Sequence, residues 1–550
     1  MKKTILLSLF LVMGAFILSA SETGAQSLKK ANKLLENESY TNALIEYNDL
    51  VKEEPGNVMY GYYLVNAYLQ VERIDSAGMV LQRYEAAGAG DPYYLLASAA
   101  LALNSKNNQL AKDLITQALT KVSSEKKDMI VYDPDFLVAM ANSVAFGRGD
   151  KDVCELGIDA ILKTLSVDSK NYDLLIAAGK LYYTVPDGTN ALKYYKAALD
   201  IEDNKPAAYV GYGLVYRLIA QYGSAEIEFQ KALAIDPDYA PAYREIAEMN
   251  NQMEDYPKAI QFYKEYLARS EKTLLNLRRY AIIQYNGSDY QGTIATTEEF
   301  LREDPNNADM LKLEAYSYNN LGDSVKVVEL MDRFFDAAKS DPTKVKAYDY
   351  ELYGNAQKKL GNELATVKAY EKAVELDSTK SLLLTDVAAY YFKEKNWDMA
   401  IYYYQLKERI ENGLSLVEYF ALGRAYFFAK KYTEGAEAFD VLLKNKPDFA
   451  IGYYWKGNCE TQIEAHDSSK VGLARVSYEK FIELASAEPS KYKAQLISAY
   501  DYMGFFYYSQ KDNPEYKSTW AASARNAYQQ ILSLDPSNKS AADNLKAIPK

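Results

Sequence analysis

The chain has 550 residues, of which 49% are hydrophobic, and a formal net charge of −12. This acidic balance argues against general binding to nucleic acid or to anionic membranes. With one histidine, two cysteines and no P-loop, HExxH or strand-linked GxGxxG motif, the chain offers neither a zinc cluster nor the usual catalytic arrangements, so we expect no enzyme, cofactor or metal.

Residues 1–25 have the features of a secretory signal. Two lysines precede an apolar stretch at residues 5–18, which is too short and too close to the N-terminus to predict a membrane span. Cleavage is expected after Ala20 or Ala25. No later stretch is apolar enough to predict a span of the bilayer, so we expect an exported protein with no direct membrane span.

The sequence around the first candidate cleavage site resembles a bacterial lipobox. It contains Leu18, Ser19 and Ala20, but Ser21 stands where the lipid-bearing cysteine would be. We therefore expect a periplasmic protein that is not a lipoprotein, with any outer-membrane association made through partners.

Small and aromatic residues recur every 34 positions along the middle of the chain. The clearest series are Ala191, Ala225 and Ala259; Gly213, Ala247, Ala281 and Ala315; and Tyr209, Tyr243, Leu277 and Leu311. A fixed period of this length is typical of stacked helical repeats. Such an array buries area only between neighbouring repeats, and its function generally lies in the long surface that it presents.

The best single copy of the repeat runs from Pro206 to Tyr239. Its first stripe of residues at helical spacing is Tyr209, Tyr212, Gly213 and Tyr216. Its second stripe is Ala225, Phe229 and Ala232. Residues with little or no side chain let two helices approach closely, while Phe229 fills the space between them. Pro237 then ends the unit, because proline cannot continue a helix.

This pattern resembles the tetratricopeptide repeat, and the resemblance covers nearly the whole chain after the signal. It implies an all-α, right-handed solenoid of about 14 helix-turn-helix units with a C-terminal capping helix at Lys539 to Ile548. The expected blocks are 1–25, the signal; 26–121, N-terminal repeats; 122–170, an irregular repeat; 171–448, regular central repeats; and 449–550, C-terminal repeats. Three polar insertions, near residues 122–135, 463–472 and 510–519, are expected to be surface loops.

Cys154 and Cys459 lie about nine repeats apart, so a rigid array should hold them beyond bridging distance. We interpret both as small buried residues rather than as a disulfide or redox pair.

The resemblance implies that the first helix of each unit lines a concave groove. The candidate groove residues of the central repeats are Arg217, Arg244, Arg278, Lys312, Asn319, Tyr285 and Tyr316. A basic, amide-rich strip on an acidic protein suits carboxylates or acidic peptide. The alternative is that each cation pairs with a nearby acid such as Glu245, Glu248 or Glu314. The pattern does not match the carboxylate clamp of chaperone-binding members of the family.

Farther along the chain the same positions become aromatic. The residues are Phe420, Phe427, Tyr454, Phe505 and Tyr508. Exposed aromatic side chains in a groove suit extended peptide, partner helices or sugar rings. The alternative is that some of them belong to the packing stripe, because the insertions shift the phase of the repeat.

Three short motifs resemble acceptors for O-glycosylation in Bacteroidota. They are Asp75-Ser76-Ala77, Asp323-Ser324-Val325 and Asp377-Ser378-Thr379. The alternative interpretation is that Asp and Ser at these predicted turns cap helices.

Together these features predict a non-enzymatic scaffold that binds protein partners of the bacterial cell envelope through its concave groove. The partners expected from the groove are acidic or extended peptides. The alternative function is a glycan-binding module of the SusD type at the outer membrane.

Overall fold

The computed structural model describes residues 24–86, 88–126 and 128–549. The contacts within the chain divide it into two compact units, with Pro305 ending the first and Asn306 beginning the second. The boundary falls inside the block 171–448 that the sequence period marks as regular. The predicted signal lies almost entirely outside the described residues, which begin with a helix at 24–36.

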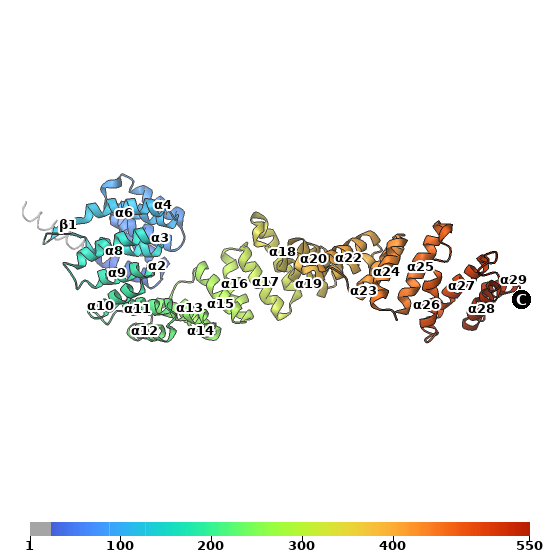
Figure 1. Cartoon of the computed structure of the whole chain (residues 1–550). Coiled ribbons are helices and arrows are strands. Elements are labelled where there is room, and N and C mark those ends of the chain that lie inside the picture. The colour runs from blue at the N-terminus through green and yellow to red at the C-terminus, as the bar shows by residue number, and fades with distance from the viewer. Residues whose placement is uncertain (1–23, 87, 127, 550) are drawn as a thin grey trace, which may run out of the picture. The chain divides into compact units, whose positions relative to one another are not determined.

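Unit 1 consists of consecutive helices with one small sheet (Figure 1). Its elements after the helix at 24–36 are α2 Tyr40–Glu53, α3 Val58–Gln70, α4 Ile74–Arg83, η1 Gly88–Gly90, α5 Pro92–Asn104, α6 Asn108–Val122, β1 Ser123–Lys126, β2 Met129–Tyr132, α7 Pro134–Phe146, α8 Lys151–Leu165, α9 Tyr172–Thr184, α10 Gly188–Leu199, α11 Pro206–Leu218, α12 Tyr222–Ile235, α13 Ala240–Gln252, α14 Tyr256–Arg269, α15 Leu274–Asn286 and α16 Tyr290–Glu303.

Unit 2 continues the alternation of helices. Its elements are α17 Ala308–Leu321, α18 Ser324–Ala337, η2 Ala338–Ser340, η3 Pro342–Lys344, α19 Ala347–Lys359, α20 Glu363–Leu376, η4 Ser378–Leu383, α21 Leu384–Lys393, α22 Trp397–Glu411, α23 Leu416–Phe428, α24 Tyr432–Asn445, α25 Ala450–His466, η5 Ser468–Lys470, α26 Arg475–Ala485, α27 Lys493–Ser509, α28 Trp520–Leu534 and α29 Lys539–Ala547. Over the described residues the α-helices form fourteen successive pairs followed by α29, so the predicted all-α array with a terminal helix is confirmed.

A glycine on the first helix of a pair faces an aromatic ring on the second helix, as the sequence predicts. A Cβ atom added to Gly213 in α11 would lie 2.6 Å from Cε1 of Phe229 in α12. The same contact recurs in other pairs, as Gly179 with Tyr195, Gly354 with Tyr370 and Gly423 with Phe439. The absence of a side chain is therefore what allows the two helices of a pair to close on the ring.

This close approach predicts opposite effects for two glycines of the same repeat. Gly213→Ala should destabilise its repeat by about 1–3 kcal/mol, because the methyl group overlaps the Phe229 ring. Gly223 in α12 has nothing within 4 Å of its added Cβ, so Gly223→Ala should be neutral or stabilising by up to about 1 kcal/mol. Hydrogen exchange across α11 and α12 measures both; equal protection in the two variants would contradict the packing argument.

The first insertion lies largely at the surface, as predicted for 122–135, but it forms a β-hairpin rather than a loop. Strands β1 and β2 pair antiparallel, with Ser123 opposite Tyr132 and Lys126 opposite Met129. Val131 is buried, and the backbone N–H of Tyr132 donates to Oγ1 of Thr164 at 3.1 Å. The apolar second strand thus anchors the charged first strand to α8.

The other two insertions contain short helical segments and turns. Helix α25 continues to His466 and is followed by η5, whereas residues 510–519 form turns that lead into α28. Both cysteines are buried and free, as predicted. Burial raises the pKa of each thiol to about 12, which keeps both thiols in the unreactive protonated form at neutral pH.

Two of the three Asp-Ser motifs contain capping residues. The side chain of Asp323 accepts a hydrogen bond from the backbone N–H of Lys326 at the start of α18, and that of Asp377 accepts from Thr379 at the start of η4. Asp75 lies inside the first turn of α4 instead. Capping therefore accounts for the aspartate of two motifs.

Candidate partner-binding surface

Two of the three basic residues of unit 1 that were predicted to line a groove, Arg217 and Arg244, meet acidic residues of the same unit. Nη1 of Arg217, on α11, lies 2.6 Å from Oε2 of Glu245 on α13. Nη2 of Arg244, on α13, lies 2.8 Å from the other oxygen of the same carboxylate. Glu245 is buried and joins the two cations. The internal pairing that was the alternative to a ligand groove is therefore present at Arg217 and Arg244.

A second carboxylate reaches Arg244 from the beginning of the chain. Glu38 follows the first helix of the array, has a left-handed φ of 59° and is only 6% exposed. Its carboxylate accepts hydrogen bonds from Arg244 and, at 2.5 Å, from the hydroxyl of Tyr266. Burial would lower the pKa of Arg244, but the charges of Glu38 and Glu245 raise it well above its ordinary value.

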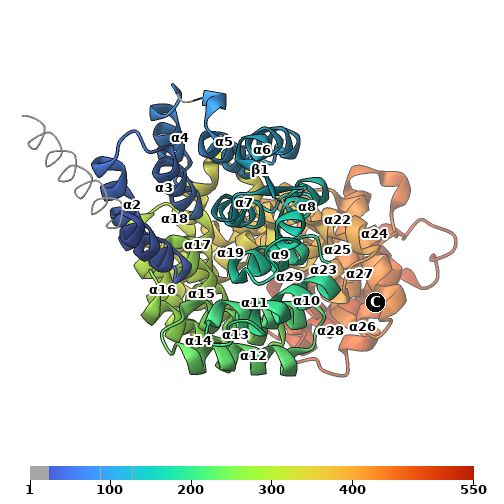
Figure 2. The same ribbon diagram turned by 90° about the vertical axis from the view of Figure 1, so that its left-hand side faces the viewer.

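The residues around Glu38 make further contacts with the same part of unit 1. We call residues 36–41 the N-terminal turn. Glu36 accepts from the hydroxyl of Tyr239 at 2.9 Å, the side chain of Asn37 accepts from the N–H of Ala240 at 2.8 Å, and the hydroxyl of Thr41 donates to Glu271 at 2.7 Å. Figure 2 shows α2 near α15 and α16, and Thr41, at the start of α2, makes the contact with Glu271. The N-terminal turn therefore occupies the polar face of α13 and the start of α15.

The remaining two candidates of unit 1 lie on α15. The guanidinium of Arg278 lies 5.8 Å from the ring centroid of Phe300, and its Nε atom has no hydrogen-bond partner among the residues that the structure describes. The Tyr285 ring contacts that of Tyr290, with centroids 5.7 Å apart. These two residues are half-buried, and neither belongs to the cluster around Glu245.

The candidates Lys312, Tyr316 and Asn319 lie on α17, in unit 2. The ammonium group of Lys312 donates to the carbonyl of Lys344 at 3.1 Å and lies 3.8 Å from Asp349, which is fully buried. Tyr316 donates its hydroxyl hydrogen bond to the same aspartate, and Asn319 is half-buried on the same helix. Lys312 and Tyr316 thus hold the start of α19, so their side chains have a structural role.

Three of the five aromatic candidates near the C-terminal end of unit 2 take part in packing, as the alternative interpretation allows. Phe420 lies 5.5 Å from Phe449 between ring centroids, and Tyr454 lies 5.3 Å from Phe481. The ring of Phe427 lies 5.3 Å from that of Trp455. All three remain half-buried, so each presents part of its ring to solvent.

Two aromatic residues nearer the C-terminus are exposed. On α27, Phe505 is 65% exposed and Tyr508 is 41% exposed. Both rings are therefore accessible to solvent.

An arginine that sequence reasoning missed lies among the aromatic residues of unit 2. The guanidinium of Arg424, on α23, lies within 5.1 to 6.0 Å of four ring centroids. The four rings, which with Arg424 we call the aromatic cage, belong to Phe392, Phe420, Phe428 and Trp455. They come from α21, α23 and α25, the first helices of three successive pairs.

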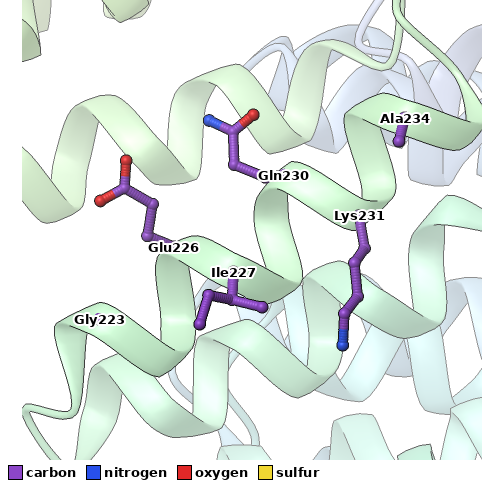
Figure 3. Close-up of a pocket in the computed structure, with 6 residues that line it drawn as sticks. All are labelled: Gly223, Glu226, Ile227, Gln230, Lys231 and Ala234. Carbon is purple, nitrogen blue, oxygen red and sulfur yellow. The ribbon is translucent and has the colours of Figure 1, made fainter.

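One surface hollow of unit 1 lies on a single helix. Figure 3 shows its six lining residues, all from α12, which are Gly223, Glu226, Ile227, Gln230, Lys231 and Ala234. Glu226 forms an ion pair with Lys258 at 2.5 Å and Lys231 with Glu228 at 2.8 Å. Ile227 is 58% exposed. This surface is an open helix face whose charged groups are paired, and it contains no acid–base arrangement for catalysis.

The described residues offer neither a metal-binding group nor a helix that could cross a membrane. Within 24–86, 88–126 and 128–549, no three His, Cys, Asp or Glu side chains are grouped so that they could hold a metal ion. Over these residues no helix combines the length and the apolar character that a membrane crossing requires.

Comparison with known proteins identifies the repeat. Family models described as tetratricopeptide repeat match residues 206–239, 350–380 and 420–488. A TPR repeat-containing protein of Methanocaldococcus jannaschii is 22% identical over 342 residues, which are 60% of this chain and 54% of that protein. The chain thus spans about half the length of this curated relative.

Solved structures include similar proteins. The C-terminal part of a TPR repeat-containing protein from Cytophaga hutchinsonii is 28% identical, with 48% of this chain and 98% of that one covered and a TM-score of 0.33. YrrB, a TPR protein with an unusual peptide-binding site, is 19% identical, with 36% and 99% covered and a TM-score of 0.31. The first matched range, 206–239, coincides with the best single copy of the repeat in the sequence, Pro206 to Tyr239.

Proposed function

The chain belongs to the tetratricopeptide repeat family, and on that premise we propose that it is an exported scaffold that holds protein partners in the bacterial cell envelope. The repeats indicate a protein-interaction scaffold. The observation that carries the proposal is a stripe on the first helix of a pair. Val417, Phe420, Arg424 and Phe428 follow one another at helical spacing along α23.

This stripe has the composition of a contact surface. Val417 is 78% exposed and Phe428 is 38% exposed, and a large apolar side chain left in water suits burial by a partner. Ordered helices present these groups in fixed positions, so binding spends little conformational entropy. The cell-envelope setting is supported by the lysines and the apolar stretch of residues 1–25 in the sequence.

Crosslinking in the native envelope, followed by mass spectrometry of the captured proteins, tests the proposal. Val417→Ser should lower the recovery of a captured partner several-fold, because it removes exposed apolar area from the stripe. Val325→Ser is the matched control, since Val325 is also exposed and also the second residue of a helix, but of the second helix in its pair. Equal recovery in both variants would remove the stripe from the proposal.

The same preparation checks export and the alternative function. The mature N-terminus should follow Ala20 or Ala25 in the periplasmic fraction, and an intact N-terminus in the cytoplasm would refute export. Binding on a glycan array, with no protein captured by crosslinking, would favour the SusD-like glycan-binding function instead.

A further inference from the structure

Arg424 lacks an acidic partner of the kind that Arg217 and Arg244 have. Arg217 and Arg244 pair with Glu245. In the part of the chain that the structure describes, no carboxylate forms an ion pair with Arg424, and its Nε atom has no hydrogen-bond partner. Burial lowers the pKa of Arg424, and no acidic group offsets that effect.

The guanidinium of Arg424 lies over the faces of the surrounding rings, and its buried Nε atom has no hydrogen-bond partner among the described residues. The nearest centroids are those of Trp455 at 5.1 Å and Phe392 at 5.2 Å. Cation–π contacts of this kind attract the guanidinium to the ring faces. A planar guanidinium held in this way is ready to bind a carboxylate through two parallel hydrogen bonds.

The surroundings of Arg424 indicate what should accompany the carboxylate. Val417 and Phe428 mark the two ends of the stripe, seven residues before and four residues after Arg424. At about 1.5 Å per residue the stripe is about 16 Å long, which about five residues of extended chain can cover. Side chains two residues apart on an extended chain point the same way and lie about 6.6 Å apart. Phe420 and Phe428 each lie four residues, about 6 Å, from Arg424 along the helix, so apolar residues that flank the acid on the same side can lie on these two rings.

We propose that the aromatic cage binds an Asp or Glu side chain of an extended partner peptide, with apolar side chains on either side of the acid lying on Phe420 and Phe428. The inference rests on the proposed scaffold function and names the chemistry of its partner. Charge complementarity carries it: the stripe offers one cation without a carboxylate between two exposed apolar groups.

The test uses the full chain and a peptide with both ends capped, so that its only carboxylate is a side chain. The peptide has a central Leu-Ser-Glu-Ser-Leu segment, and the matched peptide has Gln in place of Glu. Two of the three tryptophans of the chain, Trp397 and Trp455, lie at the cage, with Trp397 stacked on Phe428 at 4.8 Å. In a Trp520→Phe background their fluorescence reports binding.

The protein should bind the Glu peptide at least about tenfold more tightly than the Gln peptide, as expected for a charge-assisted bidentate contact. Arg424→Gln should bring the ratio of the affinities for the Glu and Gln peptides to about one. Arg424→Lys should lower this ratio several-fold, because lysine keeps the positive charge but lacks the two parallel N–H donors of the guanidinium. Arg409→Gln is the control, since Arg409 is exposed on α22 and its loss changes the net charge equally. Far-UV circular dichroism confirms that each variant is helical.

Three outcomes would overturn the inference. They are equal affinity for the two peptides, discrimination that persists in Arg424→Gln, and competition by glucuronic acid at the peptide's own concentration. The crosslinking result separates this failure from that of the scaffold function. If the protein and Arg424→Gln captured a partner equally, the scaffold function would be supported and the binding of an acidic side chain by the aromatic cage would be contradicted.

Discussion

Glu38→Gln is expected to destabilise unit 1 by about 3 kcal/mol, because it removes the charge that pairs with a largely buried Arg244. The substitution also weakens the hydrogen bond from Tyr266. Loss of this pair should release the N-terminal turn from α13 and α15. Hydrogen exchange should therefore accelerate together at residues 36–41 and around residues 239–271, although these segments are far apart in the sequence.

The matched control is Glu72→Gln. Glu72 lies 34 residues after Glu38, has the same φ of 59° and is exposed. A substitution there should change stability by less than about 0.5 kcal/mol. If Glu38→Gln changed the free energy of unfolding as little as Glu72→Gln, the pairing of the N-terminal turn with Arg244 would not contribute to stability.

This pairing also decides how the basic face can be tested. Reversing the charge of Arg244 would break an internal ion pair and place like charges next to Glu38 and Glu245. If such a variant no longer bound a protein partner, the cause could be damage to the fold rather than loss of a binding residue. Substitutions on the α23 stripe avoid this difficulty, because Val417 is exposed and Arg424 has no carboxylate partner among the described residues.

Glu418→Gln is expected to cost about 3–5 kcal/mol in the repeats around α22 and α23. The ammonium group of Lys407 is buried and lies 2.5 Å from the Glu418 carboxylate, which also accepts from Thr385 and from Ser415. Glutamine would leave the Lys407 charge with only Glu411, at 3.6 Å. Glu483→Gln, which breaks an exposed pair with Lys480, should cost no more than about 1 kcal/mol.

The pH dependence of stability gives a second measure of the Glu418 pair. Burial alone would raise the pKa of Glu418, but the hydrogen bonds from Lys407, Thr385 and Ser415 lower it to about 2. Its stabilising contribution is thus complete above the ordinary glutamate pKa of about 4.3 and is lost as the pH falls toward about 2. As the pH falls through that window, the difference in the free energy of unfolding between the protein and Glu418→Gln should become smaller. A constant difference would contradict the assigned pair.

The sequence predicts what lies within one repeat. Gly213 and Phe229 are 16 residues apart, so their contact follows from the spacing of two adjacent helices. The hairpin was missed because Glu125 and Lys126 have little tendency to form strands, and the apolar residues that hold it come later. The contact of Glu38 with Arg244 spans 206 residues and depends on curvature that accumulates over many repeats, which no local pattern contains.

The aromatic cage was missed for a different reason. Phe392, Arg424 and Trp455 are spaced 32 and 31 residues apart, because the cage runs diagonally across three first helices. A fixed period of 34 relates equivalent positions of successive repeats, and residues spaced 32 or 31 apart are not at equivalent positions. Only the placement of the three helices brings these residues together.

The N-terminal turn has a further consequence for how the two units unfold. A linear array is held by neighbour contacts alone, so it can open one repeat at a time. In unit 1 the hydrogen bonds from residues 36–41 to residues 239–271 join repeats at opposite ends of a long segment. Closing that segment requires its intervening helices to be in place, which raises the contact order and delays the final folding step. We therefore expect unit 1 to melt as a single cooperative block and unit 2 to melt progressively.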